Sequence, residues 1–384
     1  MPVIQPKFIA IDSSLLGQWA ADTCSKDIVR QKQAALMRDE LFVANWIPVL
    51  YWHHFEELVR HANEEVAESR VKFLLTLPLV AWVSRADCRT EIIGSVVDLH
   101  ATEIKIFLSL DQCNTSTNEF IQSTRADLLR FAKPSEITML AMWRELRPYL
   151  MDMGIKQQEI ASICHTTEDT YANVPLSALN NNTAMSWELA KQFYSEEVSS
   201  ISNELVRRGD KRLSNPDDLA AWFCDMVFSN VAAISGIHRP PAEAFVEHFG
   251  FSIGDFHGAI TLGEFREVVR RRKQLEVSVA QLGLRIEDVW PKLRDRLMPS
   301  EEIISQIRKS RKNAARSSGS DLNDDYHATL IPYLDAVVVN KRTHENLRQA
   351  KRKNPELSLL LKPVLKASCY HLIPSILRNN KNFA

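Results

Sequence analysis

Acidic residues gather in the stretch from Asp321 to Arg342, which reads DLNDDYHATLIPYLDAVVVNKR. Asp321, Asp324 and Asp325 come first, and the β-branched run Val337 to Val339 follows them. Carboxylate oxygens are the ligands that hard cations such as Mg²⁺ prefer. The same pattern is also typical of a solvated helix start, where the helix dipole favours negative charge, followed by a buried strand of a parallel sheet. Taken alone, the stretch favours this structural interpretation.

A second candidate lies near the start of the chain, where the apolar run Phe8 to Ile11 ends in Asp12-Ser13-Ser14. The run predicts a short buried strand, and Ser13 or Ser14 is expected to cap the helix after it. Ligands of open α/β sheets bind at the carboxyl ends of the strands. Asp12, followed by two hydroxyl groups, is therefore placed to hold a cation.

The third candidate is a predicted helix from Tyr51 to Glu68, which follows a short predicted strand from Ile47 to Leu50. Apolar residues at helical spacing form its core face, and Glu56 and Glu57 lie beside that face. Either glutamate could be a solvated surface residue or could turn toward Asp12. The local sequence leaves the two alternatives open.

The stretches FIAIDSSLL, IPVLYWHHFEELV and DLNDDYHATLIPYLDAVVVNK together resemble the PIN-like nuclease domain. The resemblance covers the two ends of the chain and not its middle. It implies an α/β/α fold around a central parallel sheet, a divalent metal ion and hydrolysis of phosphodiester bonds. The family carries an aspartate after the first strand, a glutamate in an early helix and one or two aspartates late in the domain.

The resemblance assigns Asp12, Glu57 and Asp324 as catalytic acids, with Glu56 as the alternative to Glu57. Asn340 stands where the family often has a final aspartate, which puts one of two metal positions in doubt. The residues that could hold Mg²⁺ or Mn²⁺ are Asp12, Glu56, Glu57, Asp321, Asp324, Asp325, Asp335 and Asn340. Those expected to contact or orient the substrate are Ser13, Ser14, His327, Lys341, Arg342, Arg311 and Lys312.

Basic residues flank the acidic stretch, although the whole chain has a net charge of only −1. The segment from Glu301 to Ser320 is a predicted basic helix that becomes a Ser/Gly-rich linker, and Lys351 to Lys353 extend the charge on the other side. Such an arm would attract phosphates to the carboxylates. By the resemblance, the expected partner is single-stranded RNA in preference to DNA.

The composition indicates a globular protein of the reducing cytoplasm. No apolar run is long enough for a membrane-spanning helix, and the first residues do not read as a signal peptide. The six cysteines are scattered without CxxC spacing, which argues against a zinc site and against a disulfide framework.

Residues 1–105 and 300–384 are expected to form one discontinuous α/β domain, because the late acids can meet Asp12 only if both ends share a sheet. Residues 106–299 are expected to be a mainly helical insertion that gates the cleft or binds a protein regulator. On the predicted helix over residues 92–110, Asp98 and Glu103 could face the metal pocket, but solvated positions are favoured. The sequence leaves the oligomeric state open.

Two other functions compete with the endoribonuclease. One is a binding or regulatory module of the same fold with little or no catalysis, and the other is a DNA-directed defence nuclease. Convergence of Asp12, Glu56 or Glu57, and Asp324 is the feature that separates an enzyme from a module.

Overall fold

The computed structural model of the chain describes residues 5–87, 91–110, 115–167, 172–181, 187–235, 240–256, 259–311 and 320–380. The chain divides into two compact units. The first, here the sheet unit, consists of Met1–Met153, Leu275–Asn313 and Asn323–Ala384. The second, here the helical unit, consists of Gly154–Gln274 and Ala314–Leu322. The sheet unit is thus assembled from three separate segments.

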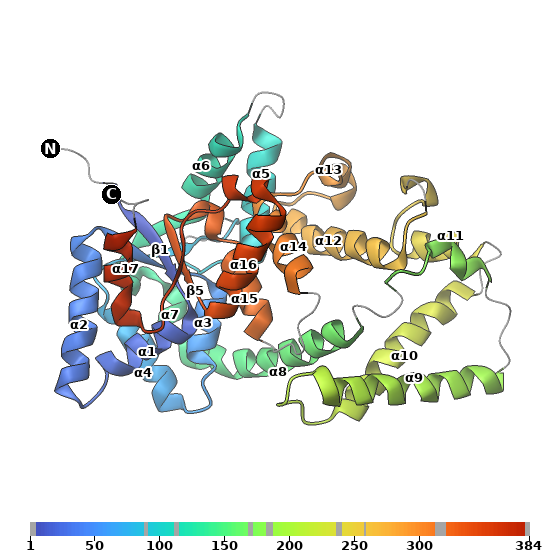
Figure 1. The fold of residues 1–384 in the computed structure, drawn as a ribbon, viewed down its shortest axis with the longest axis horizontal. Helices are drawn as coiled ribbons and strands as arrows, with labels where there is room; N and C mark the ends of the chain where they lie inside the picture. Colours follow the sequence, from blue (N-terminus) through green and yellow to red (C-terminus); the bar gives the residue numbers. More distant parts are fainter. Residues whose placement is uncertain are drawn as a thin grey trace. The chain divides into compact units, whose positions relative to one another are not determined.

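Within the described residues, six strands form one sheet in the order β4-β3-β2-β1-β5-β6 (Figure 1). Neighbouring strands are parallel, except that β4 runs antiparallel to β3. The strands are β1 Lys7–Ile11, β2 Trp46–Leu50, β3 Val80–Val83, β4 Leu129–Ala132, β5 Ala336–Val339 and β6 Val364–Lys366. The predicted α/β class with a mainly parallel sheet is confirmed, as are strands near residues 8–11, 47–50 and 337–339.

Both faces of the sheet are buried. Side chains alternate along a strand, so Ile9 and Ile11 of β1 join one core with Val338. Ala10 and Val337 join a second core on the opposite face. A strand that is buried on both faces has no solvated side, which explains why β1 and β5 read as unbroken apolar runs.

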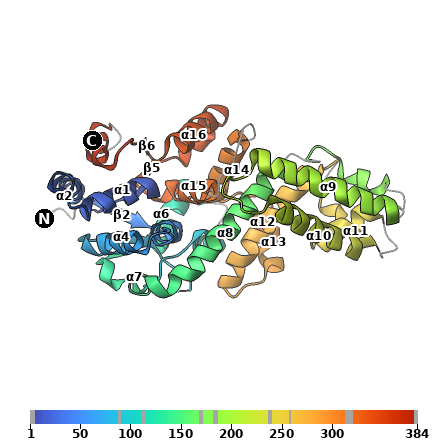
Figure 2. The same cartoon turned by 90° about the horizontal axis from the view of Figure 1, so that it is seen from below.

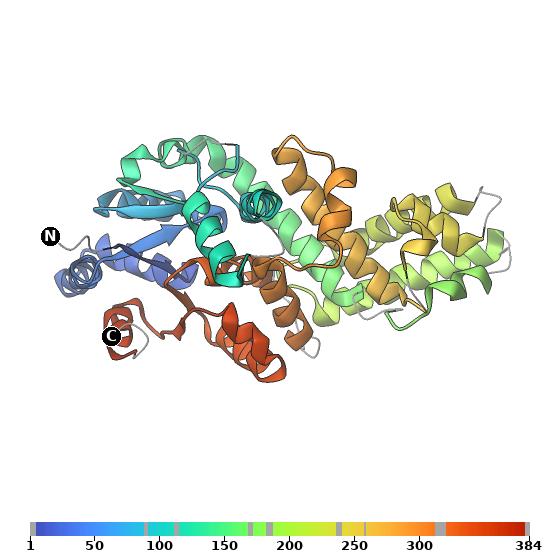
Figure 3. The ribbon, with the colours of Figure 1, turned by 90° about the horizontal axis from the view of Figure 1, so that it is seen from above.

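Helices cover both faces (Figures 2 and 3). The first core receives side chains from α1 Ser13–Thr23, α2 Ile28–Val43, α3 Trp52–Val59, α4 Glu64–Thr76, α7 Thr138–Ala141 and α17 Ile373–Asn379. The second receives side chains from α5 Val96–Ser109, α6 Thr117–Leu128, α14 Pro299–Arg311, α15 Ser320–Ala328 and α16 Lys341–Lys353. The sheet unit also contains α13 Ile286–Leu293 and the 3₁₀ helices η1 Pro134–Glu136, η4 Ile331–Tyr333, η5 Pro355–Leu359 and η6 Tyr370–Leu372.

The predicted helix over residues 51–68 is two helices, so that prediction was wrong. α3 ends at Val59, and α4 begins at Glu64 after the N-cap Asn63. The Asn63 side chain accepts hydrogen bonds from the backbone N–H groups of Glu65 and Val66, which is the usual way an asparagine starts a helix.

The sheet unit extends beyond the expected limits of residues 1–105 and 300–384. α6 and β4 belong to it, because β4 pairs with β3 from Val80 opposite Ala132 to Val83 opposite Leu129. Leu275–Asn313 also belongs to it. The intervening unit is therefore shorter than the expected insertion over residues 106–299. The sequence did not show this, because β4 is recognised by its pairing with β3 and not by its local sequence.

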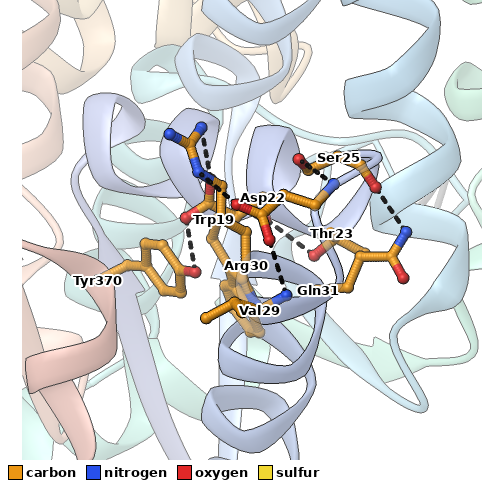
Figure 4. Close-up of polar contacts among 9 residues, drawn as sticks. Trp19, Asp22, Thr23, Ser25, Val29, Arg30, Gln31 and Tyr370 are labelled. Carbon is orange, nitrogen blue, oxygen red and sulfur yellow. Dashed lines mark hydrogen bonds and ion pairs between the residues drawn. The ribbon is translucent and has the colours of Figure 1, made fainter.

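The C-terminal segment is tied to the first two helices (Figure 4). The Tyr370 hydroxyl donates a hydrogen bond of 2.9 Å to Asp22 Oδ2, and Arg30 Nη1 lies 3.9 Å from Asp22 Oδ1. The indole of Trp19 donates to the carbonyl of Ala34 at 3.0 Å, which joins α1 to α2. Residues from both ends of the chain thus complete one layer.

The helical unit packs around phenylalanine side chains. The ring of Phe265 lies 5.4 to 6.0 Å from the rings of Phe245, Phe249, Phe251 and Phe256. Its elements are η2 Leu176–Asn181, α9 Trp187–Arg208, α10 Pro216–Ser235, α11 Pro241–His248 and η3 Ile253–Asp255, and its boundaries fall within α8 Trp143–Thr167 and α12 Leu262–Gln281. Among the helices of the described residues, none combines the length and the apolar character needed to cross a membrane.

Candidate functional site

Asp12 lies at the carboxyl end of β1, and its position is fixed by the backbone. Its N–H donates to the carbonyl of Val338 on β5 at 2.9 Å. Its Oδ1 accepts hydrogen bonds from the N–H of Ser14 at 2.9 Å and from the Ser14 hydroxyl. Asp12 is thus the N-cap of α1, where a serine was expected, because α1 already begins at Ser13.

The two glutamates of α3 have different partners. Glu56 is fully buried and binds His53 Nδ1 at 3.1 Å and Arg60 Nη1 at 3.0 Å. Glu57 is half-buried, and its Oε1 accepts a hydrogen bond of 2.6 Å from Asn323 Nδ2 on α15. Consecutive helix residues point about 100° apart, so only one of the pair can face α15. Glu57 is that residue, and Glu56 forms an internal ion pair.

Asp324 of α15 is joined to the end of β5. Asn340 Nδ2 donates a hydrogen bond of 2.8 Å to Asp324 Oδ2. Asn340 Oδ1 accepts from the N–H of Thr343 at 2.8 Å and so caps α16. A backbone N–H can only donate, which orients the amide with its nitrogen toward Asp324. In this arrangement the amide oxygen of Asn340 caps α16, and its expected role as a neutral oxygen ligand stays a prediction.

Asp325 and Asp335 each lie beside an arginine. Asp325 is buried, and its Oδ2 lies 3.7 Å from Arg308 Nε of α14. Asp335 precedes β5, at the opposite edge of the sheet from Asn340. It accepts from the N–H of Phe8 at 2.7 Å and from both terminal nitrogens of Arg125 at 2.9 and 2.7 Å. The expectation that Asp335 assists the metal was wrong, because it is at the start of its strand.

A pair of histidines lies behind the acids. His54 Nε2 is 3.0 Å from His327 Nδ1, and His327 Nε2 is 3.2 Å from the carbonyl oxygen of Val338. A carbonyl only accepts, so His327 carries its proton on Nε2 and His54 donates through Nε2. Both rings are buried. His327 was expected to contact the substrate, but its burial makes it a structural link between α15 and β5.

The pKa values of these histidines indicate neutral rings at pH 7. Burial lowers the pKa of His54 well below its usual value, and the neighbouring His327 and His53 lower it further. Burial also lowers the pKa of His327, while the negative charges of Asp12 and Glu57 oppose that shift. Both carboxylates therefore lie within electrostatic reach of the same imidazole.

Basic residues lie beside the acids along α16 and β6. Lys341 and Arg342 are exposed in the first turn of α16, directly after Asn340. Lys366 ends β6 opposite Val339. Burial lowers the pKa of His344, and the charge of Lys366 lowers it further, so these two side chains are near each other.

Several residues were missed or fall outside the description. The sequence pattern had no signal for Asn323 or for the ion pair of Arg308. Asn323 contacts Glu57 because α15 lies beside α3, and Arg308 contacts Asp325 because α14 lies beside α15. Lys366 was missed because β6 has only three residues. The side chains of Asp321 and Arg311, and all of Lys312, lie outside the described residues.

Asp12, Glu57 and Asp324 therefore lie at the same edge of the sheet. Within the described residues, no three His, Cys, Asp or Glu side chains are arranged so that they could hold a metal ion. Glu57 and Asp324 are instead bound by the amides of Asn323 and Asn340. The donor chemistry nevertheless fits a hard cation, because the candidate ligands are carboxylate oxygens and the described hydrogen bonds to the Asp12 carboxylate use Oδ1 alone.

Comparison of the chain with protein-family models, with curated proteins and with solved structures finds no match in any of the three. The resemblance to PIN-like nucleases thus depends on the sequence motifs, and the function that it implies stays a prediction.

Proposed function

We propose that the chain is a divalent-metal-dependent nuclease of the PIN-like type that cleaves single-stranded RNA internally. The observation that supports the proposal is that three acids from separate segments all lie at the carboxyl edge of the sheet. Asp12 follows β1, Glu57 is on the helix after β2, and Asp324 is bound to the residue that follows β5. They come from opposite ends of the chain, so local sequence does not explain why they share one edge of the sheet.

The strand order supports a ligand site at this position. From β1 the sheet continues through β2 and β3 on one side and through β5 and β6 on the other. In open α/β sheets, ligands bind where the strand order reverses, at the carboxyl ends of the strands. That place is the junction of β1 and β5, where Asp12 and Asn340 lie.

Asp12, Glu57 and Asp324 are the residues that would hold Mg²⁺ or Mn²⁺. Such an ion supplies an activated water and stabilises the charge that develops on the phosphoryl group. Asp12 is preorganised by Ser14 and by the backbone of β5. Glu57 and Asp324 must leave the amides that now bind them, and hydrogen bonds to charged groups contribute about 1.5 to 3 kcal/mol each. This cost predicts weak metal binding in the absence of substrate.

Cations next to the acids suit a polyanionic substrate. Lys341, Arg342 and Lys366 lie at the same edge of the sheet and would neutralise phosphates on either side of the scissile bond. The preference for RNA over DNA is taken from the resemblance. We place the enzyme in a reducing cytoplasm, in keeping with the free thiols of the described cysteines, Cys24, Cys164, Cys224 and Cys369.

The proposal is tested by incubating end-labelled single-stranded RNA and DNA with the protein and Mn²⁺ or Mg²⁺. Wild type should cut RNA internally and should lose activity in EDTA. Asp12→Asn, Glu57→Gln and Asp324→Asn should each lower the rate by at least about tenfold, as expected for loss of a charged metal ligand. Cleavage that persists in all three variants would refute the assignment.

Asp335→Asn provides a matched control. It removes a carboxylate from the same stretch but from the opposite edge of the sheet, where Asp335 pairs with Arg125. We expect this variant to be less stable and to retain metal-dependent cleavage below its melting temperature. Loss of activity without loss of stability in this variant would place the site elsewhere.

A nucleic-acid-binding module without catalysis is the second candidate, favoured by the amide contacts that satisfy Glu57 and Asp324 without a metal. A module would bind RNA, would not cleave it at any metal concentration, and would keep its affinity in Asp12→Asn.

A further inference from the structure

The outer face of α2 carries an apolar stripe that no described residue covers. Val29, Leu36 and Val43 are 73%, 59% and 84% exposed, and Ile28 beside them is 66% exposed. The three residues are spaced seven apart, so they lie within about 20° of one line along the helix. Most exposed apolar residues occur singly, whereas these three share one face of the helix at intervals of about 10 Å, two helical turns.

The opposite face of α2 is buried against the sheet unit. Ala34, Met37 and Leu41 are buried in the first core of the sheet unit. The stripe therefore points away from the sheet and not into an unfilled part of the core. Figures 1 and 3 show α2 at the outer margin of the sheet unit.

Polar residues border the stripe in an ordered way. Seen down the helix with Leu36 at the centre, Lys32 and Asp39 lie on one side, about 40° and 60° away. Gln33 and Glu40 lie at corresponding angles on the other side. Lys32, Gln33 and Asp39 are exposed, and Glu40 is half-buried, with Oε2 3.4 Å from Arg378 Nη1.

We propose that α2 is a homodimer interface, in which the α2 helices of two copies of this chain pair in antiparallel orientation across a two-fold axis beside Leu36. Leu36 then packs on the partner's Leu36, and Val29 packs on the partner's Val43. This interface is independent of the proposed nuclease site.

The polar residues beside the stripe are complementary to those of a second copy in the antiparallel orientation. In the antiparallel pair, a residue four positions before Leu36 lies within about 1.5 Å, in height along the helix, of the partner residue three positions after Leu36 on the same side. Lys32 lies next to the partner's Asp39 on one side, and Gln33 lies next to the partner's Glu40 on the other. Opposite charges and an amide–carboxylate pair therefore border the apolar line on both sides.

The parallel arrangement is disfavoured by the same residues. It would bring Asp39 against the partner's Glu40 at the same level, on both sides of the interface. Like charges placed so close oppose association. The α2 face is thus self-complementary in one orientation only.

The expected affinity is modest, because α2 has 16 residues and is about 24 Å long. Interfaces of this size are at the small end for specific complexes. We expect dissociation constants of about 10 to 100 μM, the range of weak association. Sedimentation velocity of the full chain, from about 1 μM to about 500 μM, spans this range and should show a monomer becoming a dimer.

Single substitutions test the surface. Leu36→Glu puts two like charges next to the axis and should abolish the dimer at every concentration. Because Leu36 is exposed, the melting temperature of the monomer should not change. A wild type that stays monomeric throughout the range would overturn the proposal, as would a dimer that survives Leu36→Glu.

Charge reversal tests the orientation. Lys32→Asp and Asp39→Lys should each weaken the dimer at least tenfold, and the double variant Lys32→Asp/Asp39→Lys should restore it. Lys133→Asp, an exposed lysine after β4, is the control and should leave the dimer unchanged. Failure of the double variant to restore association would refute the antiparallel pairing.

Discussion

A buried glutamate should make the stability of the sheet unit fall as the pH rises through neutrality. Glu103 of α5 is fully buried, so the expected solvated position was wrong, and burial raises its pKa from 4.5 to about 7. Its carboxyl group accepts hydrogen bonds from the N–H of Ser300 at 3.0 Å, from the Ser300 hydroxyl at 2.5 Å, and from the Tyr333 hydroxyl. These donors lower the pKa but do not cancel the effect of burial. Glu103 thus joins α5 to the start of α14 and to η4.

The fall in stability with rising pH follows from the difference in proton binding between the folded and unfolded states. The folded pKa is above the unfolded one, so the folded protein binds the proton more tightly between these two values. The stabilisation by the protonated group is complete below pH 4.5 and is lost as the pH rises through about 7. The difference between the two pKa values corresponds to about 3 kcal/mol of unfolding free energy.

Glu103→Gln should remove this dependence, because glutamine resembles the protonated acid and does not titrate. Urea denaturation at pH 4.5, 6 and 8 should show the variant gaining up to about 3 kcal/mol relative to wild type as the pH rises. The comparison must be made between the two proteins, since other groups titrate in both. A constant difference across this range would refute the assignment of a buried, raised pKa to Glu103.

Three other outcomes are expected in the sheet unit. Asp335→Asn should lower the unfolding free energy by about 2 to 3 kcal/mol, because it leaves the half-buried Arg125 without its carboxylate partner; chemical denaturation measures this loss. Asn340→Ala should cost about 1 kcal/mol, since it removes the cap on Thr343 N–H, and a Thr343→Ala control should retain the cap and lose less. His327→Gln should reduce acid sensitivity, because the lowered pKa of His327 makes wild type lose stability as the pH falls through 6.5; equal loss in both proteins would contradict this.

Local sequence was sufficient for the strands that are buried on both faces. The runs that became β1, β2 and β5 are short and apolar throughout, so their pattern and length identify them without knowledge of their neighbours. The same reasoning placed Asp12 at a strand end. β4 and β6 were missed because they are short edge strands whose pairing depends on β3 and β5.

The choice among the acids needed the tertiary structure. Glu56 and Glu57 are neighbours in an amphipathic helix, and only the position of α15 shows which one faces the other acids. Asp335 and Asp324 are close in sequence, yet η4 and the direction of β5 send them to opposite edges of the sheet. Both distinctions depend on contacts between segments far apart in the chain.

Sequence alone therefore determined the class of fold, the central strands and the position of Asp12 at a strand end, because those features follow from hydrophobic patterns over a few residues. The tertiary structure decided which other side chains lie at the same edge of the sheet and how each is held. Asn340 illustrates the difference: its position after β5 could be read from the sequence, but the orientation of its amide is set by the N–H of Thr343 and the carboxylate of Asp324, which come together only in the folded chain.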